Sequence, residues 1–298
     1  MGKNKTILAY WALAAISLFW GSTWFVAKIA VQHIPPFQLT GYRQTLAGLI
    51  LMLFFLVKDK KVPPLKNILF HVLMGFLFFT CSNGLTTMAV QYIPSFLGAL
   101  LGCLFPFALI LADFLFFKVR LKNNLIAALF LGFVGIATIL LSFSKEMSGK
   151  NFALGIVLTL IGVCTWTIGT LISTKMSLKI DPLRGIGWQM FFGGIFLLIN
   201  SQLFENPISF HQISSVGWLS FMYLTLVGSL ISFVCYIYAL KILPLNLVSI
   251  YVYINPIVAF LLGVLFLDEK FTLQVIVGII ITFVAIYFVK KLNTAKLN

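Results

Sequence analysis

Charged side chains, and acids above all, are scarce in this sequence. Only 9% of the 298 residues are charged, and only seven are aspartate or glutamate. A soluble domain carries about a quarter charged residues, so this scarcity excludes an ordinary soluble protein. Hydrophobic residues make up 61% of the chain. The net charge of +14 comes from basic residues scattered between apolar runs, which is typical of membrane topology and not of a nucleic-acid-binding surface.

Motifs for metal, disulfide and nucleotide chemistry are also missing. The chain has no CxxC pair, and its cysteines lie singly in apolar segments: Cys81, Cys103, Cys164 and Cys235. Its histidines lie far apart, at His33, His71 and His211, and its acids are isolated. A metal-dependent membrane enzyme needs such ligands clustered, and direct use of ATP needs a Gly-rich phosphate loop. We therefore expect no metal, no cofactor, no enzymatic activity and no nucleic-acid partner.

Long apolar runs fill the chain instead. A bilayer core requires about 20 apolar residues per helix, and the charges, prolines and polar clusters divide the sequence into ten such spans. These are predicted at residues 7–30, 37–57, 66–90, 94–117, 122–143, 152–175, 184–203, 213–240, 244–267 and 271–290. The sequence thus predicts an all-α integral membrane protein with short connections and a lipid bilayer as its surroundings.

Lysine and arginine set the orientation of these spans. If the N-terminus is inside, 16 basic residues fall on the cytoplasmic side and four, Lys28, Lys145, Lys150 and Lys270, fall outside. Arg43 alone remains within a span. The bias predicts a multi-pass protein of the cytoplasmic (inner) membrane with both termini in the cytoplasm.

The sequence also repeats itself. Shifts of 146 and 150 residues align the two halves at Trp20 with Trp166, Pro36 with Pro182, Gly41 with Gly187, Pro94 with Pro244, and Pro106 with Pro256. Two units are predicted, at 1–145 and 151–298, each with five spans. Because five is odd, the second unit enters the membrane from the opposite side, and such inverted repeats are typical of secondary transporters. An ancestral duplication that serves only as a scaffold is the alternative.

Four stretches resemble a known family. They are "FWGSTWFVAK" in the first span, "GYRQTLAG" in the second, "YAL" before Pro244, and "INPIVAFLLGVLFLDEKFT" from the ninth span onward. Together they are similar to the EamA-type branch of the drug/metabolite transporter superfamily over essentially the whole chain. The resemblance implies a ten-helix carrier of small metabolites or drugs, frequently an exporter and often of amino acids. The family's glutamate is matched by Glu269, whereas Val119 stands at the equivalent place in the first half.

Polar residues inside spans mark candidate substrate contacts, because they are costly there without partners. In the ninth span the candidates are Asn246, Ser249 and Tyr253, predicted to share one face with Pro256, and Asn255 beside it. The matching face of the fourth span is apolar around Pro106. One polar and one apolar wall would suit an amphiphilic ligand, although hydrogen bonds between helices explain the pattern equally well. Both prolines are predicted to kink their helices and free a carbonyl.

The tryptophans lie near the middle of their spans. A mid-span indole needs a partner for its N–H, so we predict that Trp20 with Thr23, and Trp166 with Thr170, face a central path. Interfacial anchoring is the alternative. The further polar candidates are Asn83 in the third span and Tyr236 and Tyr238 in the eighth.

Arg43 lies about two turns into the second span and could meet a substrate carboxylate; pairing with carbonyls at a helix end is the alternative. Among the acids only Asp113 lies securely inside a span, and not at its centre. Proton-driven carriers usually need an embedded acid, so facilitated diffusion or exchange is favoured.

The predicted function is a secondary transporter that moves a small metabolite by alternating access, with export of amino acids or related metabolites favoured. Multidrug or nucleoside/sugar transport would fit the same spans, and a membrane enzyme, a channel or a receptor is a remoter alternative. Composition leaves the substrate, the direction of transport and a homodimer open.

Overall fold

The computed structural model describes residues 3–60, 62–119, 121, 123–143, 149–176 and 182–294, and the regular elements among them are all helical. Five segments cross the bundle in each half. Those of the first half are α1 (Lys3–Ala30), α2 (Pro36–Asp59), α3–η1–α4 (Leu65–Gly75, Phe76–Gly84 and Leu85–Ala89), α5–α6 (Ser95–Gly102 and Phe105–Phe117) and α7 (Asn123–Ser142). Those of the second half are α9 (Lys150–Met176), α10 (Pro182–Phe204), α11–η3–α12 (Ser215–Tyr223, Leu224–Ile231 and Ser232–Ile242), α13–α14 (Leu245–Val248 and Tyr251–Phe266) and α15 (Leu273–Thr294).

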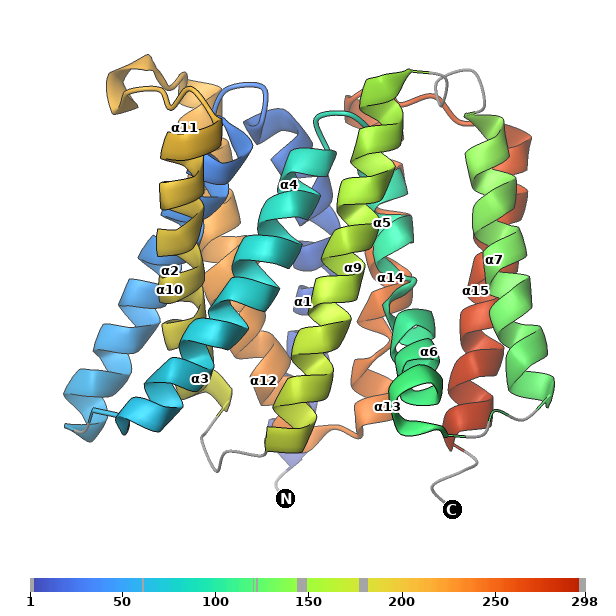
Figure 1. The fold of residues 1–298 in the computed structure, drawn as a ribbon, viewed down its shortest axis with the longest axis horizontal. Coiled ribbons are helices and arrows are strands. Elements are labelled where there is room, and N and C mark those ends of the chain that lie inside the picture. Colours follow the sequence, from blue (N-terminus) through green and yellow to red (C-terminus); the bar gives the residue numbers. More distant parts are fainter. Residues whose placement is uncertain are drawn as a thin grey trace.

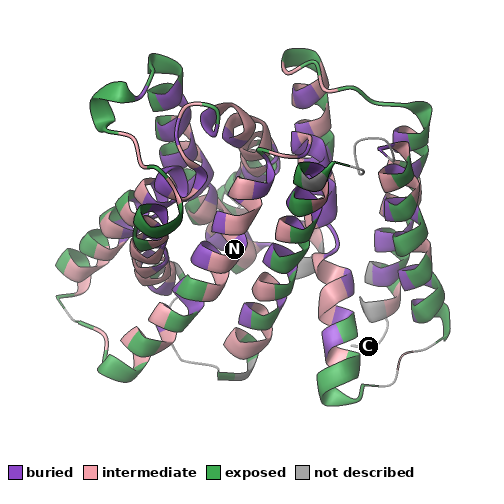
Figure 2. Ribbon diagram, turned by 45° about the horizontal axis from the view of Figure 1, so that its top comes forward, coloured by how far each residue is buried: buried purple, intermediate pink, exposed green. Residues whose placement is uncertain are grey.

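The ten predicted spans are confirmed as ten helical segments. Eight of these segments are long and apolar enough to cross a membrane, and two shorter apolar stretches, Tyr251–Phe266 and Leu273–Val289, complete the set. Exposed residues follow the outward faces of the helices and buried residues follow the inward faces (Figure 2). Large apolar side chains such as Trp11, Phe130 and Leu219 are among the exposed ones, as a lipid-facing surface requires.

Helices of one half pair with their counterparts in the other. α2 packs along α10 and α7 packs along α15, while α1 packs on α12 and α14 of the second half and α9 on η1, α4, α5 and α6 of the first. Both chain ends lie at the same end of the bundle, and α1 and α9 run in opposite directions (Figure 1). This is the reciprocal pairing that an inverted repeat requires.

Glycines allow these pairs to approach closely. A Cβ on Gly48 of α2 would overlap the backbone nitrogen of Phe191 in α10, and a Cβ on Gly194 of α10 would overlap Thr45 in α2. The contact is therefore reciprocal: each helix presents a glycine to the backbone or side chain of the other. α2 and α10 form a tightly packed unit that positions Arg43, which lies on α2 two residues before Thr45.

The two prolines lie at different places in their helices, and the predicted kinks stay predictions. Pro106 lies in the first turn of α6, immediately after the helix is interrupted at Cys103 and Leu104. Pro256 lies inside α14, where it cannot donate to the carbonyl of Val252. That carbonyl accepts a hydrogen bond from the Cys103 thiol at 3.3 Å instead. The carbonyl that Pro256 frees thus joins the fourth and ninth spans.

The third and eighth spans each contain a π-helical segment, η1 and η3. The two segments begin at Phe76 and Leu224, 148 residues apart, close to the shifts that align the halves. π-Helical turns are rare and are frequently found at functional sites. Their presence at matching places in both halves supports a common origin and marks the level at which the candidate site is built.

Candidate functional site

Trp20 of α1 is the centre of an aromatic cluster formed with the second half. Its ring centroid lies 5.2 Å from those of Phe233 and Tyr236 on α12 and 5.1 Å from that of Tyr251 on α14. Its indole Nε1 donates to the carbonyl oxygen of Gly228 in η3 at 3.2 Å. The partner that a mid-span indole requires is therefore a backbone carbonyl of the opposite repeat. Tyr236 was among the predicted substrate contacts, and Tyr251 was not.

Arg43 reaches the same π-helical segment from α2. Its side chain is only 7% exposed, and its Nε donates to the Ser229 hydroxyl at 2.9 Å. A Cβ on Gly228 would lie 2.8 Å from Thr23 and 3.3 Å from the Arg43 guanidinium, so both side chains lie directly against Gly228. Among the residues that the structure describes, no aspartate or glutamate forms an ion pair with Arg43. Trp20, Thr23 and Arg43 therefore converge on one short piece of η3.

Gln44 extends this polar group toward the third span and was missed by the sequence prediction. Its Nε2 donates to Asn83 Oδ1 in η1 at 3.1 Å, while its Oε1 is buried without a hydrogen-bond partner. An amide next to Arg43 in an apolar span was the available signal, because polar side chains in the membrane interior are costly without partners. The predicted Asn83 thus binds Gln44, the residue that follows Arg43 in α2.

Trp166 and Thr170 of α9 form a second, separate group. The Trp166 ring lies 4.7 Å from Phe78 in η1, and the Thr170 hydroxyl donates to the Trp166 carbonyl at 2.9 Å. Phe78 and Gly228 are 150 residues apart, so both tryptophans face matching positions of the π-helical segment in the opposite half. The predicted equivalence of the two tryptophans is present in their contacts. Trp166 packs on a ring, however, and Trp20 bonds a carbonyl.

The candidates of the ninth span have different surroundings. Asn255 and Tyr253 contact neighbouring helices. The Asn255 amide, oriented so that its nitrogen donates, bonds the carbonyls of Ser17 at 2.9 Å and Tyr251 at 3.0 Å, and so joins α14 to α1. Tyr253 packs with its ring 6.1 Å from that of Phe283. Ser249 lies in the break between α13 and α14. The side chain of Asn246 lies outside the described part of the chain.

Tyr238 of α12 packs against an apolar cluster that includes Ala9, Ile16 and Ala239, and Tyr236 and Tyr251 pack against the same cluster. The structure brings Trp20, Thr23 and Arg43 together at Gly228, and Tyr236 joins them through the Trp20 ring.

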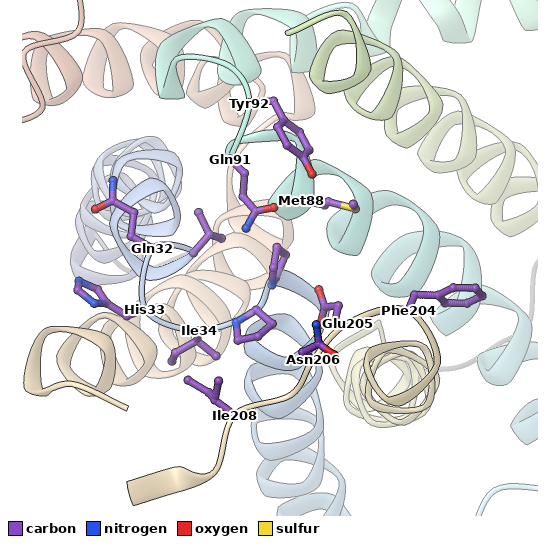
Figure 3. A pocket seen from close by; sticks show the side chains of 13 residues that line it. Gln32, His33, Ile34, Met88, Gln91, Tyr92, Phe204, Glu205, Asn206 and Ile208 are labelled. Atoms are coloured by element: carbon purple, nitrogen blue, oxygen red, sulfur yellow. The ribbon is translucent and has the colours of Figure 1, made fainter. Parts of the chain in front are cut away.

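A pocket of about 480 Å³ opens at the end of the bundle opposite the chain termini (Figure 3). Its floor and walls come from the α1–α2 connection and the ends of α4 and α10. Lining side chains are Gln32, His33, Ile34, Met88, Gln91, Tyr92, Phe204, Glu205, Asn206 and Ile208. Glu205 lies here because it accepts hydrogen bonds from the backbone nitrogens of Phe37 and Gln38, at 2.8 and 3.1 Å, at the start of α2. The pocket thus adjoins the first turn of the helix that carries Arg43.

The Trp20→Phe substitution tests the indole hydrogen bond. Phenylalanine keeps a ring in the aromatic cluster and removes the donor, so the hydrogen bond from the indole to the Gly228 carbonyl is lost. We expect a loss of about 0.5–1.5 kcal/mol of folded-state stability, seen as a lower melting temperature of the purified protein. Trp166→Phe is the matched control, because the Trp166 ring packs against Phe78 and its indole donates no hydrogen bond within the described part of the chain. Equal losses in both variants would contradict the assignment.

Ten helical segments, paired reciprocally across two halves around buried polar side chains, define a polytopic membrane carrier. A model of the EamA-like transporter family matches residues 7–141 and again residues 153–290. The chain belongs to the EamA-like transporter family, within the drug/metabolite transporter superfamily, and is a transporter and not an enzyme. The two matches to one model indicate a duplicated unit, while the boundaries 1–145 and 151–298 stay predictions.

Relatives agree with this membership, and a solved structure shows the same fold. The chain is 32% identical to the uncharacterized inner membrane transporter YedA of Escherichia coli K12 over 88% of its own length and 84% of that protein. It is 24% identical to the uncharacterized transporter YvbV of Bacillus subtilis, with 99% and 94% covered. A crystal structure of a protein 16% identical to it superposes with a TM-score of 0.65 over 97% of this chain and 98% of that one, which shows the fold. The protein is a multi-pass transporter of the inner membrane.

Proposed function

We propose that this transporter carries a small metabolite with a carboxylate group by alternating access, and that amino acids or related metabolites are exported. The observation that supports this is Arg43, a buried guanidinium with no acid partner among the described residues. A buried cation is costly unless it is paired. A substrate carboxylate would supply that pairing through a charge-assisted hydrogen bond.

The surroundings of Arg43 support a ligand with a second, apolar part. The aromatic cluster of Trp20, Phe233, Tyr236 and Tyr251 adjoins Gly228 through the Trp20 indole, and the Arg43 guanidinium contacts the same glycine. Rings of this kind offer large apolar surfaces. The cluster would accept the apolar part while Arg43 holds the carboxylate.

Orientation and coupling complete the proposal. The excess of Lys and Arg near the end that holds both termini supports a cytoplasmic location for that end, so the pocket beside Glu205 would face outside. Asp113 lies in the last turn and a half of α6, away from Arg43. With no acid beside the proposed site among the described residues, we favour facilitated diffusion or exchange over proton-driven transport. Whether two copies assemble stays open.

The test compares ligands that differ only in the carboxyl group. Leucine and tyrosine, set beside isoamylamine and tyramine, are added to purified protein in nanodiscs, and the melting temperature is followed. A ligand at about 100 times its Kd stabilises the folded state by about 2.7 kcal/mol, so the acids should raise the melting temperature and the amines should not. Equal stabilisation by the amines would instead favour multidrug transport. Stabilisation by nucleosides or sugars alone would favour the remaining alternative.

A further inference from the structure

Two charged side chains tie down the connection between α4 and α5 at the end opposite the termini. Lys28, near the end of α1, donates to the carbonyls of Gln91 at 3.3 Å and Ile93 at 3.0 Å. Glu269, in the connection after α14, accepts from the Ser95 nitrogen at 2.6 Å and the Ser95 hydroxyl at 3.0 Å. α1, the start of α5 and the end of α14 are therefore held together at this end.

The turn that carries Glu269 has a counterpart with the same backbone. Asp268 and Lys118, 150 residues apart, both adopt a left-handed conformation, with φ of 52° and 53°. The Glu269 nitrogen donates to the Gly263 carbonyl at 3.1 Å, and the Val119 nitrogen donates to the Asp113 carbonyl at 3.4 Å. The duplication thus keeps the turn and changes the side chain from a carboxylate to an isopropyl group.

The space that the Glu269 carboxylate occupies is provided by a glycine, and the first half has no glycine at the matching position. A Cβ on Gly263 would overlap the Glu269 carboxylate and would lie 3.0 Å from the Ser95 hydroxyl, so glycine is needed there. The matching residue of the first half is Asp113. Lys28 is unmatched as well, because its counterpart Thr174 donates to Leu171 within its own helix. The two positions that match Lys28 and Glu269 therefore carry no charge at the other end of the bundle.

The α2–α10 pair provides the contrast. Glu205 caps the start of α2 at one end. Its counterpart Asp59, 146 residues earlier, binds the guanidinium of Arg184 at the start of α10 with contacts of 3.0 and 3.1 Å at the other end. In the α2–α10 pair, an acid thus contacts the start of the partner helix at each end of the bundle. Lys28 and Glu269 differ, because their matching residues are uncharged.

From this asymmetry we infer that Lys28 and Glu269 form an outer latch, which closes the end opposite the termini, whereas the matching positions at the other end, Thr174 and Val119, carry no charge. The inference rests on the proposed alternating access, in which contacts at one end break as that end opens. A contact present in only one of two states shifts their populations by its own free energy. The latch therefore biases the carrier toward the state that is closed at the Glu269 end.

The experiment measures this bias without a substrate. Spin labels are placed by Gln91→Cys and Lys270→Cys, two exposed positions that flank the latch, in a variant without the four native cysteines. The distance between them is measured in nanodiscs. Glu269→Gln should raise the ratio of long to short distances about tenfold, equivalent to about 1.4 kcal/mol. Asp268→Asn should leave this ratio unchanged. It removes the negative charge of the exposed residue next to Glu269, and asparagine tolerates the left-handed conformation of this position.

Two results would overturn the latch: an unchanged distance distribution in Glu269→Gln, or an equal shift in Asp268→Asn. If Glu269→Gln does not fold, Ser95→Ala and Lys28→Met replace it. Each removes part of the same contacts and should shift the distances in the same direction by a smaller factor, and no shift in either would overturn the latch. Because no ligand is used, failure of the carboxylate proposal at Arg43 leaves this measurement valid, and the two failures are distinguishable.

Discussion

Replacing Arg43 with methionine is expected to reduce transport at least a hundredfold while raising the melting temperature. The reduction follows from the loss of the charge-assisted hydrogen bond that a substrate carboxylate would make, one of the stronger polar interactions in proteins. The rise follows from burial: Arg43 is 7% exposed and has no acid partner among the described residues. Exchanging buried ionic groups for packed apolar ones is often neutral or stabilises by about 1–4 kcal/mol.

Flux in proteoliposomes and thermal unfolding, measured on the same preparation, would check this pair of effects. Arg43→Lys is the matched control, because it keeps the positive charge and removes the planar donors that bind a carboxylate. We expect it to retain part of the flux and to gain no stability. A methionine variant that melts earlier and still transports would show that Arg43 serves only the fold.

Gly48→Ala is expected to have the largest effect on stability. The added Cβ would meet the Phe191 nitrogen, the Phe191 Cα at 2.8 Å and the Gly187 carbonyl at 2.8 Å. All three are backbone atoms of α10, so no side chain can rotate away and the two helices must separate. Overpacking typically costs about 1–3 kcal/mol and occasionally more, and here we expect about 3 kcal/mol or more.

The control for Gly48→Ala is Gly102→Ala, at the end of α5. Its Cβ would meet only the Trp24 ring, at an ordinary 3.6 Å. Alanine also has a higher helix propensity than glycine, so this variant should melt at or slightly above the temperature of the parent. The measurement is the melting temperature and the yield of monodisperse protein. Equal melting of the two variants would contradict the packing assigned to α2 and α10.

The sequence contained enough information to predict the membrane segments and their repetition. Apolar runs bounded by charges and prolines depend on local composition, and each predicted span is a helical segment. The shift of 146 residues that aligned Trp20 with Trp166 also predicted that both would have matching surroundings, which their contacts with η3 and η1 show. Such features are readable because they repeat or depend on neighbours in the chain.

The partners of the site residues could not be predicted in the same way. Gly228 accepts the Trp20 indole and contacts Arg43, yet a glycine in an apolar run has no distinguishing signal. The face predicted for the ninth span assumed one continuous helix. α13 ends at Val248 and α14 begins at Tyr251, so the spacing was counted across a break and the shared face stays a prediction. Breaks and π-turns depend on packing between spans, which a helical period does not contain.

The π-helical segments η1 and η3 have a mechanical consequence. Successive residues of an α-helix are separated by about 100° around its axis, so a hydrogen-bond register one residue wider turns everything beyond it by about that angle. Exchange between i→i+5 and i→i+4 bonding needs no break in the chain and no backbone group exposed to lipid. A change of hydrogen-bond register in η1 or η3 would therefore rotate one part of the third or eighth span relative to the other. Trp166 contacts η1 and Trp20 contacts η3, so such a rotation would change the surroundings of these indoles.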